Sequence, residues 1–359
     1  LCHATTTTAI DNNNNNSDND NSDNFFFTTR GAARATLTPH PTMYQISTRP
    51  WLYAISQKYK KSITQLNQVP LDEFTSLKKK GIDMIWLMGV WKLGVYSWAR
   101  ATELDMRKNS YVPHLPDYQF SDIIGSPYAV VDYVVNPEIG TDQDLISLKQ
   151  KLNSIGLRLM VDFVPNHSAV DAHWVTAQSE LYVLAPKNVS MPYDPSEYLP
   201  NGVAMGRDPY FAPWSDTAQW NYWNVKTREL NQQLLLKVAS MSDAIRCDMA
   251  MLLLNDVISQ VWGKQLASHG YVRPSTEWWS EAIRAVKAKY PTVQFLAEVY
   301  WGLDSKLQSL GFDFTYDKEL YDKLKSGDVR DIKTYISSLG YDRLSHGAKF
   351  VENHDEERA

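Results

Sequence analysis

The sequence predicts an α/β fold in which parallel strands alternate with helices, as in a (β/α)8 TIM barrel that is incomplete, with about seven strands. Short apolar runs alternate with longer amphipathic stretches from residue 43 onward. The short runs are almost continuously apolar, as expected of parallel strands that are buried on both faces. Polar residues gather at the ends of several runs. The predicted strands are Met43–Ser47, Ile82–Leu87, Leu157–Phe163, Ala244–Cys247, Gln294–Ala297, Phe312–Thr315 and Ala348–Val351.

The stretches between the predicted strands have helical periodicity. In residues 142–154, Leu145, Leu148 and Leu152 recur at the spacing that places them on one helix face, and residues 278–289 form a second such stretch. An eighth strand would be needed to close the sheet into a barrel without edges. The sequence therefore predicts an open barrel, and the absence of an eighth run before residue 359 suggests a truncated chain.

The chain divides into three predicted parts. Residues 1–38 consist largely of Thr, Asn, Asp and Ser, and we expect disorder because such a segment buries too little apolar surface to offset its ordering entropy. Residues 39–167 and 224–359 are predicted to form the catalytic barrel. Residues 168–223 follow the third strand and are rich in Pro, Tyr and Trp. A connection of this length predicts an inserted subdomain.

Composition excludes some classes of function. The net charge of −5 gives no electrostatic case for nucleic-acid binding, and no apolar run approaches the roughly 18 residues of a membrane span. The chain has two cysteines, Cys2 and Cys247, and no disulfide between them is expected. Aromatic residues make up 12% of the chain, and some of them are expected to stack on sugar rings. Compartment and oligomeric state stay open.

Two acidic residues at neighbouring strand ends suggest a reaction type. Asp248 and Glu298 follow the fourth and fifth predicted strands. Adjacent strands lie about 4.8 Å apart, so the two carboxyls are expected roughly 5–5.5 Å apart, the separation typical of retaining glycosidases. Arg246 projects from the same strand face as Asp248 and is expected to keep it ionised, as a nucleophile must be.

Four motifs occur in order along the chain. They are Asp162-x-x-x-Asn166-His167, Arg246-x-Asp248, Glu298 on an apolar strand, and Asn353-His354-Asp355. Through these motifs and their order, the chain resembles the α-amylase family, glycoside hydrolase family 13. Met43-Tyr-Gln-Ile also looks like the family's first strand, and residues 125–133 resemble the segment before its third barrel strand.

The resemblance implies roles for individual residues. Asp248 matches the nucleophile that forms a covalent glycosyl-enzyme, Glu298 the general acid/base, and Asp355 the third acid, which holds sugar hydroxyls. Residues that match groups around the cleaved sugar are Tyr128, His167, Arg246 and His354.

The resemblance also implies an activity, with two alternatives. The leading expectation is a retaining α-glycoside hydrolase that acts on α-glucans or maltooligosaccharides. A transglycosylase or glucan-rearranging enzyme of the same family is the first alternative. Met251 and Leu252 keep it open, because they replace the Lys-His pair that often shapes the acceptor side. A catalytically inert interaction domain is the second. Asn166 matches a calcium ligand of many relatives, but calcium is compatible with the sequence rather than required by it, since such a site needs six to eight oxygens.

Overall fold

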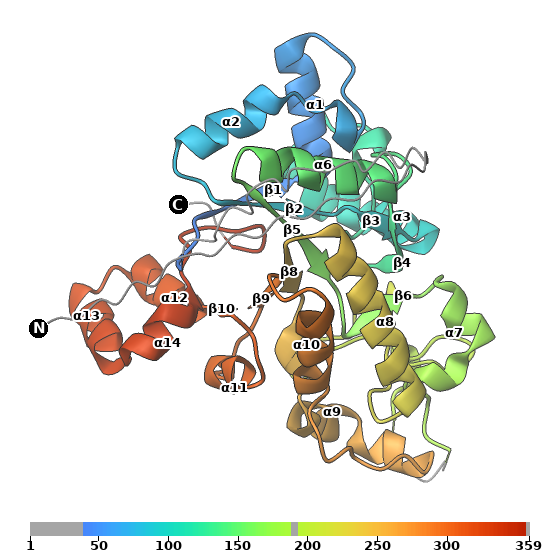
Figure 1. Cartoon of the computed structure of the whole chain (residues 1–359). Helices are drawn as coiled ribbons and strands as arrows, with labels where there is room; N and C mark the ends of the chain where they lie inside the picture. The colour runs from blue at the N-terminus through green and yellow to red at the C-terminus, as the bar shows by residue number, and fades with distance from the viewer. Residues whose placement is uncertain (1–38, 188–192, 357–359) are drawn as a thin grey trace, which may run out of the picture. The chain divides into compact units, whose positions relative to one another are not determined.

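The computed structural model describes residues 39–187 and 193–356, and the tail predicted to be disordered, residues 1–38, lies outside them. Its centre is a sheet of seven parallel strands, in the order β1-β2-β5-β8-β9-β10-β11 (Figure 1). This is the incomplete barrel that the sequence predicts. The strands are β1 (Met43–Ser47), β2 (Met84–Met88), β5 (Arg158–Phe163), β8 (Ala244–Cys247), β9 (Gln294–Ala297), β10 (Phe314–Tyr316) and β11 (Gly347–Ala348).

The predicted strand bounds hold for β1, β8 and β9, and the other strands are shifted by one or two residues or shortened. The largest correction concerns the last strand, which was predicted at Ala348–Val351 and is a two-residue strand, Gly347–Ala348. Among the residues that the structure describes, it pairs with β10 alone, through Thr315 and Tyr316. With a neighbour on one side only, the strand has half the ladder hydrogen bonds of an inner strand, and the chain leaves the sheet after Ala348.

Helices follow the strands along the chain. The two predicted helices are present with the predicted bounds, and α6 buries Leu145, Leu148 and Leu152 completely. Thr141 and Asp144 cap α6 reciprocally, which fixes its first residue. In the described part of the chain, the α-helices of five or more residues are α1 (Thr48–Tyr59), α2 (Leu71–Lys79), α3 (Val95–Ala101), α6 (Asp142–Ser154), α7 (His173–Ala177), α8 (Val225–Met241), α9 (Asn255–Ser268), α10 (Trp278–Lys289), α11 (Asp304–Ser309), α12 (Lys318–Ser326), α13 (Val329–Ser338) and α14 (Tyr341–His346).

Two small antiparallel sheets lie in the long connections. β3 (Trp91–Leu93) pairs with β4 (Val130–Val135), and β6 (His167–Ala169) pairs with β7 (Thr217–Gln219). The first pair orders the segment that leads from Tyr128 back toward the barrel. The second pair joins the third barrel strand to the end of residues 168–223, because β6 begins four residues after β5 ends.

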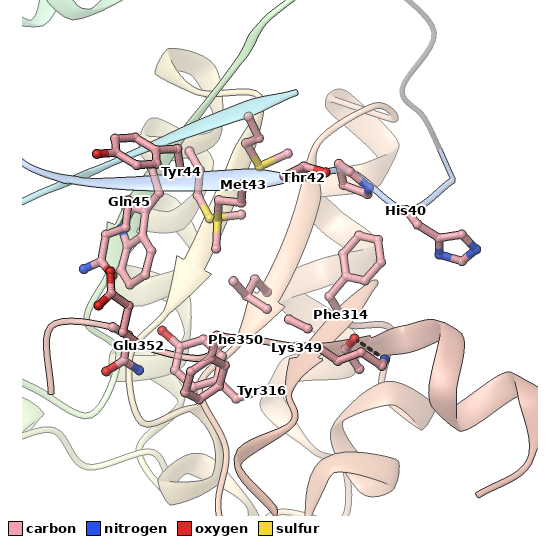
Figure 2. A pocket seen from close by; sticks show the side chains of 18 of the residues that line it. His40, Thr42, Met43, Tyr44, Gln45, Phe314, Tyr316, Lys349, Phe350 and Glu352 are labelled. Atoms are coloured by element: carbon pink, nitrogen blue, oxygen red, sulfur yellow. Dashed lines mark hydrogen bonds between the residues drawn. The ribbon is translucent and has the colours of Figure 1, made fainter. Parts of the chain in front are cut away.

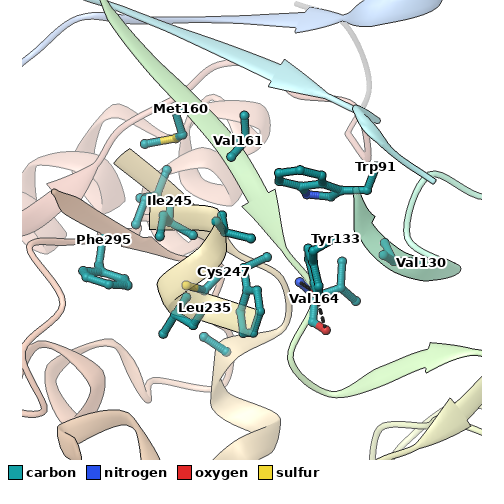
Figure 3. Packing of buried hydrophobic residues seen from close by; sticks show 14 of the residues in the cluster. Trp91, Val130, Tyr133, Met160, Val161, Val164, Leu235, Ile245, Cys247 and Phe295 are labelled. Atoms are coloured by element: carbon teal, nitrogen blue, oxygen red, sulfur yellow. Dashed lines mark hydrogen bonds between the residues drawn. The ribbon is translucent and has the colours of Figure 1, made fainter. Parts of the chain in front are cut away.

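The core of the sheet is apolar and closely packed. Met160, Val161, Ile245 and Phe295 come from three adjacent strands and are almost completely buried (Figure 3). Cys247 is a free, buried thiol in the same cluster. Within residues 39–187 and 193–356, no helix has both the length and the apolar character needed to span a bilayer.

The two edge strands, β1 and β11, are not paired with each other. Between them lies a cavity of about 980 Å³, shown in Figure 2, with Met43 and Gln45 on the side of β1 and Phe314 and Phe350 among the residues across from them. The interior of the sheet is accessible through this gap, since Trp86, Met160 and Leu296 of the inner strands also line the cavity.

Candidate active site

Arg246 lies at the centre of the predicted site. Its side chain is completely buried on β8. Nη1 lies 2.6 Å from Oδ1 of Asp248 and 3.3 Å from Oδ1 of Asp162, and Nη2 lies 2.7 Å from Oε2 of Glu298. One guanidinium therefore joins three carboxyl groups from three strand ends, and two of these are the predicted nucleophile and acid/base.

Strand register explains why these groups meet. Asp162 pairs with Arg246 between β5 and β8, and Cys247 pairs with Ala297 between β8 and β9. The backbone continues this pairing, since the amide of Glu298 donates to the carbonyl of Cys247. Asp248 and Glu298 consequently occupy equivalent positions just past the carboxyl ends of neighbouring parallel strands, the edge at which such barrels place their catalytic groups.

Three aromatic rings surround the Arg246 guanidinium. Its carbon lies 5.2 Å from the ring centroids of Trp86 and Tyr128, and 5.7 Å from that of Tyr316. Trp86 also donates from Nε1 to Oδ2 of Asp162 at 3.1 Å. These rings exclude water while offering electron-rich faces to the cation, so the buried charge is compensated on all sides.

Two further donors orient the Glu298 carboxyl. The Met249 backbone amide donates to Oε2 at 2.7 Å, and the Tyr300 hydroxyl donates to Oε1 at 2.7 Å. Met249 adopts a left-handed conformation, with φ of +42°, directly after Asp248. Backbone strain of this kind persists where the surroundings enforce it, and here it turns the amide toward Glu298.

The electrostatics of the two central carboxyls are coupled. Burial raises the pKa of both Asp248 and Glu298 above their ordinary values, and the Arg246 charge opposes this rise. The two groups affect each other in opposite directions. The Asp248 charge raises the pKa of Glu298, whereas a hydrogen bond from Glu298 lowers the pKa of Asp248. The two carboxyls therefore titrate as a coupled pair and not independently.

The fourth motif is anchored through His354. Gln45 lies 2.8 Å from its Nδ1, and the Tyr128 hydroxyl lies 2.6 Å from its Nε2. Because an amide nitrogen only donates, Nδ1 accepts and the ring hydrogen lies on Nε2. Burial and the nearby Arg246 charge lower the pKa of His354 to about 3, so the ring is neutral.

Asp355 lies beside this histidine and is more exposed than the other two predicted acids. Its carboxylate is 3.1 Å from Nε2 of His354, and 48% of its side chain is exposed. Burial and the Glu298 charge raise the pKa of Asp355 to about 6. Asp355 is thus close enough to Glu298 for the charge of one carboxylate to affect the other.

His167 is buried on β6, away from solvent. Burial lowers its pKa to about 4. The ring packs on Trp214 at 5.3 Å, and its pKa is also affected by a hydrogen bond to the Tyr128 backbone. The structure thus brings His167 next to Tyr128, which in turn contacts Arg246 and His354.

The residues around Asn166 do not fit a calcium ion. Oδ1 of Asn166 accepts from Nε2 of Gln219 at 3.0 Å, and its Nδ2 lies 3.3 Å from Oε1 of Gln219. The oxygen that a cation would need is engaged by a neutral amide. In the described part of the chain, no group of three or more His, Cys, Asp or Glu side chains is placed to hold a metal.

Sequence reasoning missed several groups that complete the site. Met251 and Leu252 are buried in the core, so their apolar character is explained by packing. Tyr300 follows Glu298 at a spacing of two, a signal that could have identified it. Trp86 and Tyr316 lie on strands whose inward faces could not be assigned without the structure, and Met249 contributes only its backbone amide. The missed groups are therefore Trp86, Met249, Tyr300 and Tyr316.

Comparison with known proteins agrees with this architecture. The family profile described as alpha amylase, catalytic domain, matches residues 71–241. Alpha-amylase 3 of Dictyoglomus thermophilum is 23% identical over 249 residues, which cover 64% of this chain and 46% of that protein. Maltase A1 of Drosophila melanogaster is 35% identical over 57 residues, which cover 16% of this chain and 10% of the maltase.

Solved structures show the same fold. An α-amylase from Lactobacillus plantarum superposes with a TM-score of 0.58 at 22% identity, covering 89% of this chain and 64% of that one. A maltogenic α-amylase from Thermotoga neapolitana gives a TM-score of 0.55 at 20% identity, covering 89% and 60%. The chain thus spans less than two thirds of the length of these relatives. Residues 71–241 thus match the catalytic domain of the α-amylase family, and the barrel and the four ordered motifs agree with that match.

Proposed function

We propose that the protein is a retaining α-glycoside hydrolase that acts on α-glucans or maltooligosaccharides through a covalent glycosyl-enzyme. One observation carries the proposal: a single buried guanidinium binds both Asp248 and Glu298 at neighbouring strand ends. The names of the relatives, which are amylases and maltases, support α-linked glucose as the substrate class.

In the first half of the proposed reaction, the Asp248 carboxylate attacks the anomeric carbon. Arg246 stabilises its ionised form, as a nucleophile requires. Glu298 gives its proton to the departing glycosidic oxygen, so the bond to the leaving sugar breaks as the bond to Asp248 forms. The Met249 amide and the Tyr300 hydroxyl then stabilise the Glu298 carboxylate that remains.

In the second half, Glu298 acts as a base. It takes a proton from water, the water oxygen attacks the anomeric carbon, and the Asp248 carboxylate leaves. The configuration at the anomeric carbon is inverted twice and is therefore retained. A sugar hydroxyl in place of water would give transfer instead of hydrolysis, and product analysis distinguishes the two.

The remaining predicted residues are proposed to hold the sugar. About half of the Asp355 side chain is exposed, so its carboxylate can accept hydrogen bonds from sugar hydroxyls, and neutral His354 holds it in place. Tyr128 and His167 are proposed to lie beside the same sugar. We also propose that residues 39–167 and 224–359 form the catalytic barrel. Residues 168–223 would then be an inserted subdomain beside the sugar-binding residues.

The test is reducing-sugar release from maltohexaose by the purified chain, with Glu298→Gln as the matched control. The proposal expects release by the wild type and loss of about 10³-fold or more in the control, because the amide has no proton to give at neutral pH. Equal rates in both proteins would contradict it. Maltohexaose binding without release would favour the inert interaction domain.

A further inference from the structure

The three rings around the Arg246 guanidinium differ in what their polar atoms contact. The indole nitrogen of Trp86 and the hydroxyl of Tyr128 both bond to other side chains. The hydroxyl of Tyr316 instead accepts a hydrogen bond from Nε of Arg246 at 3.3 Å. Of these three rings, Tyr316 is therefore the one whose polar atom holds the guanidinium directly.

Strand pairing fixes the position of Tyr316 at the end of β10. Thr315 of β10 pairs with Ala297 of β9, so the next residues along the two strands, Tyr316 and Glu298, lie at the same level. On its other side, Tyr316 pairs with Ala348 of β11. The backbone of Tyr316 is thus held between two strands, level with the proposed acid/base.

The side chain of Tyr316 is also closely packed. Its ring centroid lies 5.3 Å from that of Phe350, with an interplanar angle of 57° (Figure 2). Burial raises the pKa of Tyr316 above its ordinary value, so the hydroxyl stays neutral and its oxygen accepts from the Arg246 donor. Because only 5% of the residue is exposed, we expect its effect on a reaction to pass through Arg246 and not through contact with a sugar.

The contact at Nε bears on the direction in which the other two nitrogens of Arg246 point. A guanidinium is planar, so Nε, Nη1 and Nη2 lie in one plane and turn together. Nη1 binds Asp248 and Nη2 binds Glu298. A guanidinium free to turn about its side-chain bonds could keep one of these contacts while it loosens the other. The hydrogen bond from Nε to Tyr316 opposes such a turn.

We propose that Tyr316 is a positioning residue, which holds the plane of Arg246 so that Asp248 and Glu298 are bound at the same time. The inference rests on the proposed function, since it concerns the roles that Asp248 and Glu298 have there. Misplacement of catalytic groups lowers the rate of reaction. The loss of one hydrogen bond to a charged group corresponds to a decrease of about tenfold.

The first experiment measures the kinetics of maltohexaose hydrolysis by the full chain. Tyr316→Phe removes the hydroxyl and keeps the ring, and we expect kcat to fall about tenfold while KM changes by less than about twofold. Tyr222→Phe is the matched control, because Tyr222 is also buried and its hydroxyl donates to the Pro165 carbonyl at 2.8 Å. This control should keep the wild-type kcat. Equal losses of kcat in the two variants, or no loss in Tyr316→Phe, overturn the inference.

A double variant tests whether the effect passes through Arg246. A lysine has no donor at the position of Nε, so adding Tyr316→Phe to Arg246→Lys should lower kcat by less than about twofold. A further tenfold loss in the double variant would show that Tyr316 acts by another route, and it overturns the inference.

A spectroscopic measurement separates this inference from the proposed function. Nitrogen-15 NMR follows the rotation of the guanidinium through the exchange between its Nη1 and Nη2 signals, and the Arg246 signals are identified by their absence in Arg246→Lys. We expect the exchange rate to rise at least about fivefold in Tyr316→Phe and to stay at the wild-type value in Tyr222→Phe. This result supports the inference even in a chain that does not hydrolyse maltohexaose, where the proposed function alone fails. An unchanged exchange rate in Tyr316→Phe overturns the inference.

Discussion

Two arginines form ion pairs with carboxylates in regions of very different construction. Arg246 lies in the middle of the sheet with no exposed surface and binds Asp162, Asp248 and Glu298. Arg343 lies on α14, next to the last strand, and binds Asp304 through two nitrogens at 2.7 and 3.1 Å while 38% of its side chain stays exposed. The contacts are similarly short, but water screens the second set and not the first.

The same contrast separates the predicted acids. Asp248 and Glu298 extend from paired inner strands and are almost completely buried. Asp355 follows the two-residue strand β11, and half of its side chain is exposed. The inner strands therefore fix the groups that react, whereas the group proposed to hold sugar hydroxyls lies at the edge.

The largest expected effect is that of Arg246→Leu. Its removal leaves three buried carboxyls without their shared cation, and we expect the free energy of unfolding at pH 7 to fall by about 3–5 kcal/mol. Urea unfolding followed by circular dichroism measures it. Arg246→Lys keeps the positive charge but loses the planar set of donors, so its free energy of unfolding should lie between those of the wild type and Arg246→Leu. A loss below about 1 kcal/mol in Arg246→Leu would contradict the prediction, because the buried Arg246 ion pairs would then contribute no more than an exposed pair.

The second prediction concerns pH and the buried His167. Its pKa is lowered to about 4 from 6.5, so the unfolded chain binds the proton more tightly than the folded one. This contribution is complete above pH 6.5 and is lost as the pH falls toward 4, by up to about 3 kcal/mol. Asp162, whose pKa burial raises to about 7, acts in the opposite direction, so the wild type must be compared with His167→Gln. Unfolding curves at pH 7 and pH 4.5 should show that the free energy of unfolding falls less in His167→Gln than in the wild type. Equal losses in the two proteins would contradict a lowered pKa of His167.

The third prediction concerns the Asn166–Gln219 amide pair. Gln219→Leu leaves the buried Asn166 oxygen without its donor and should lower the free energy of unfolding by about 1–3 kcal/mol. Gln143→Leu, at an exposed position on α6, is the control and should change the free energy of unfolding by less than about 0.5 kcal/mol.

We also expect a chelator to leave the thermal midpoint of unfolding unchanged, because the Gln219 amide, and not a cation, contacts the Asn166 oxygen. A chelator that lowers the thermal midpoint as much as Gln219→Leu does would contradict this expectation.

The smallest effect is expected for Arg343→Ala. Despite two short contacts with Asp304, the pair is partly exposed, and its removal should cost less than about 1 kcal/mol. The same urea measurement applies. A loss equal to that of Arg246→Leu would remove the distinction between the two regions.

The sequence predicted the inner part of the molecule better than its edge, for a physical reason. β8 and β9 are short apolar runs that end in charged residues, and their predicted bounds agree with the structure. The last strand was predicted too long, because an apolar run does not reveal whether a neighbouring strand is present to pair with it.

The candidate site was partly accessible from sequence. Strand order alone predicts that Asp248 and Glu298 lie at neighbouring strand ends, where both contact Arg246 in the structure. The aromatic enclosure of Arg246 was not predicted, because Trp86 and Tyr316 lie far apart in the chain and look like ordinary strand residues. Nor could the sequence reveal that Gln219 occupies the Asn166 oxygen, which depends on the pairing of β6 with β7.

The most direct test of the central claim is to trap the glycosyl-enzyme. The chain is incubated with 5-fluoro-α-glucosyl fluoride, whose ring fluorine slows hydrolysis of the intermediate, then digested and analysed by mass spectrometry. The account predicts one added glycosyl group on the peptide that contains Asp248, and none on the Asp248→Asn variant. A chain that hydrolyses maltohexaose but carries the label on Asp162, Glu298 or Asp355 would contradict it.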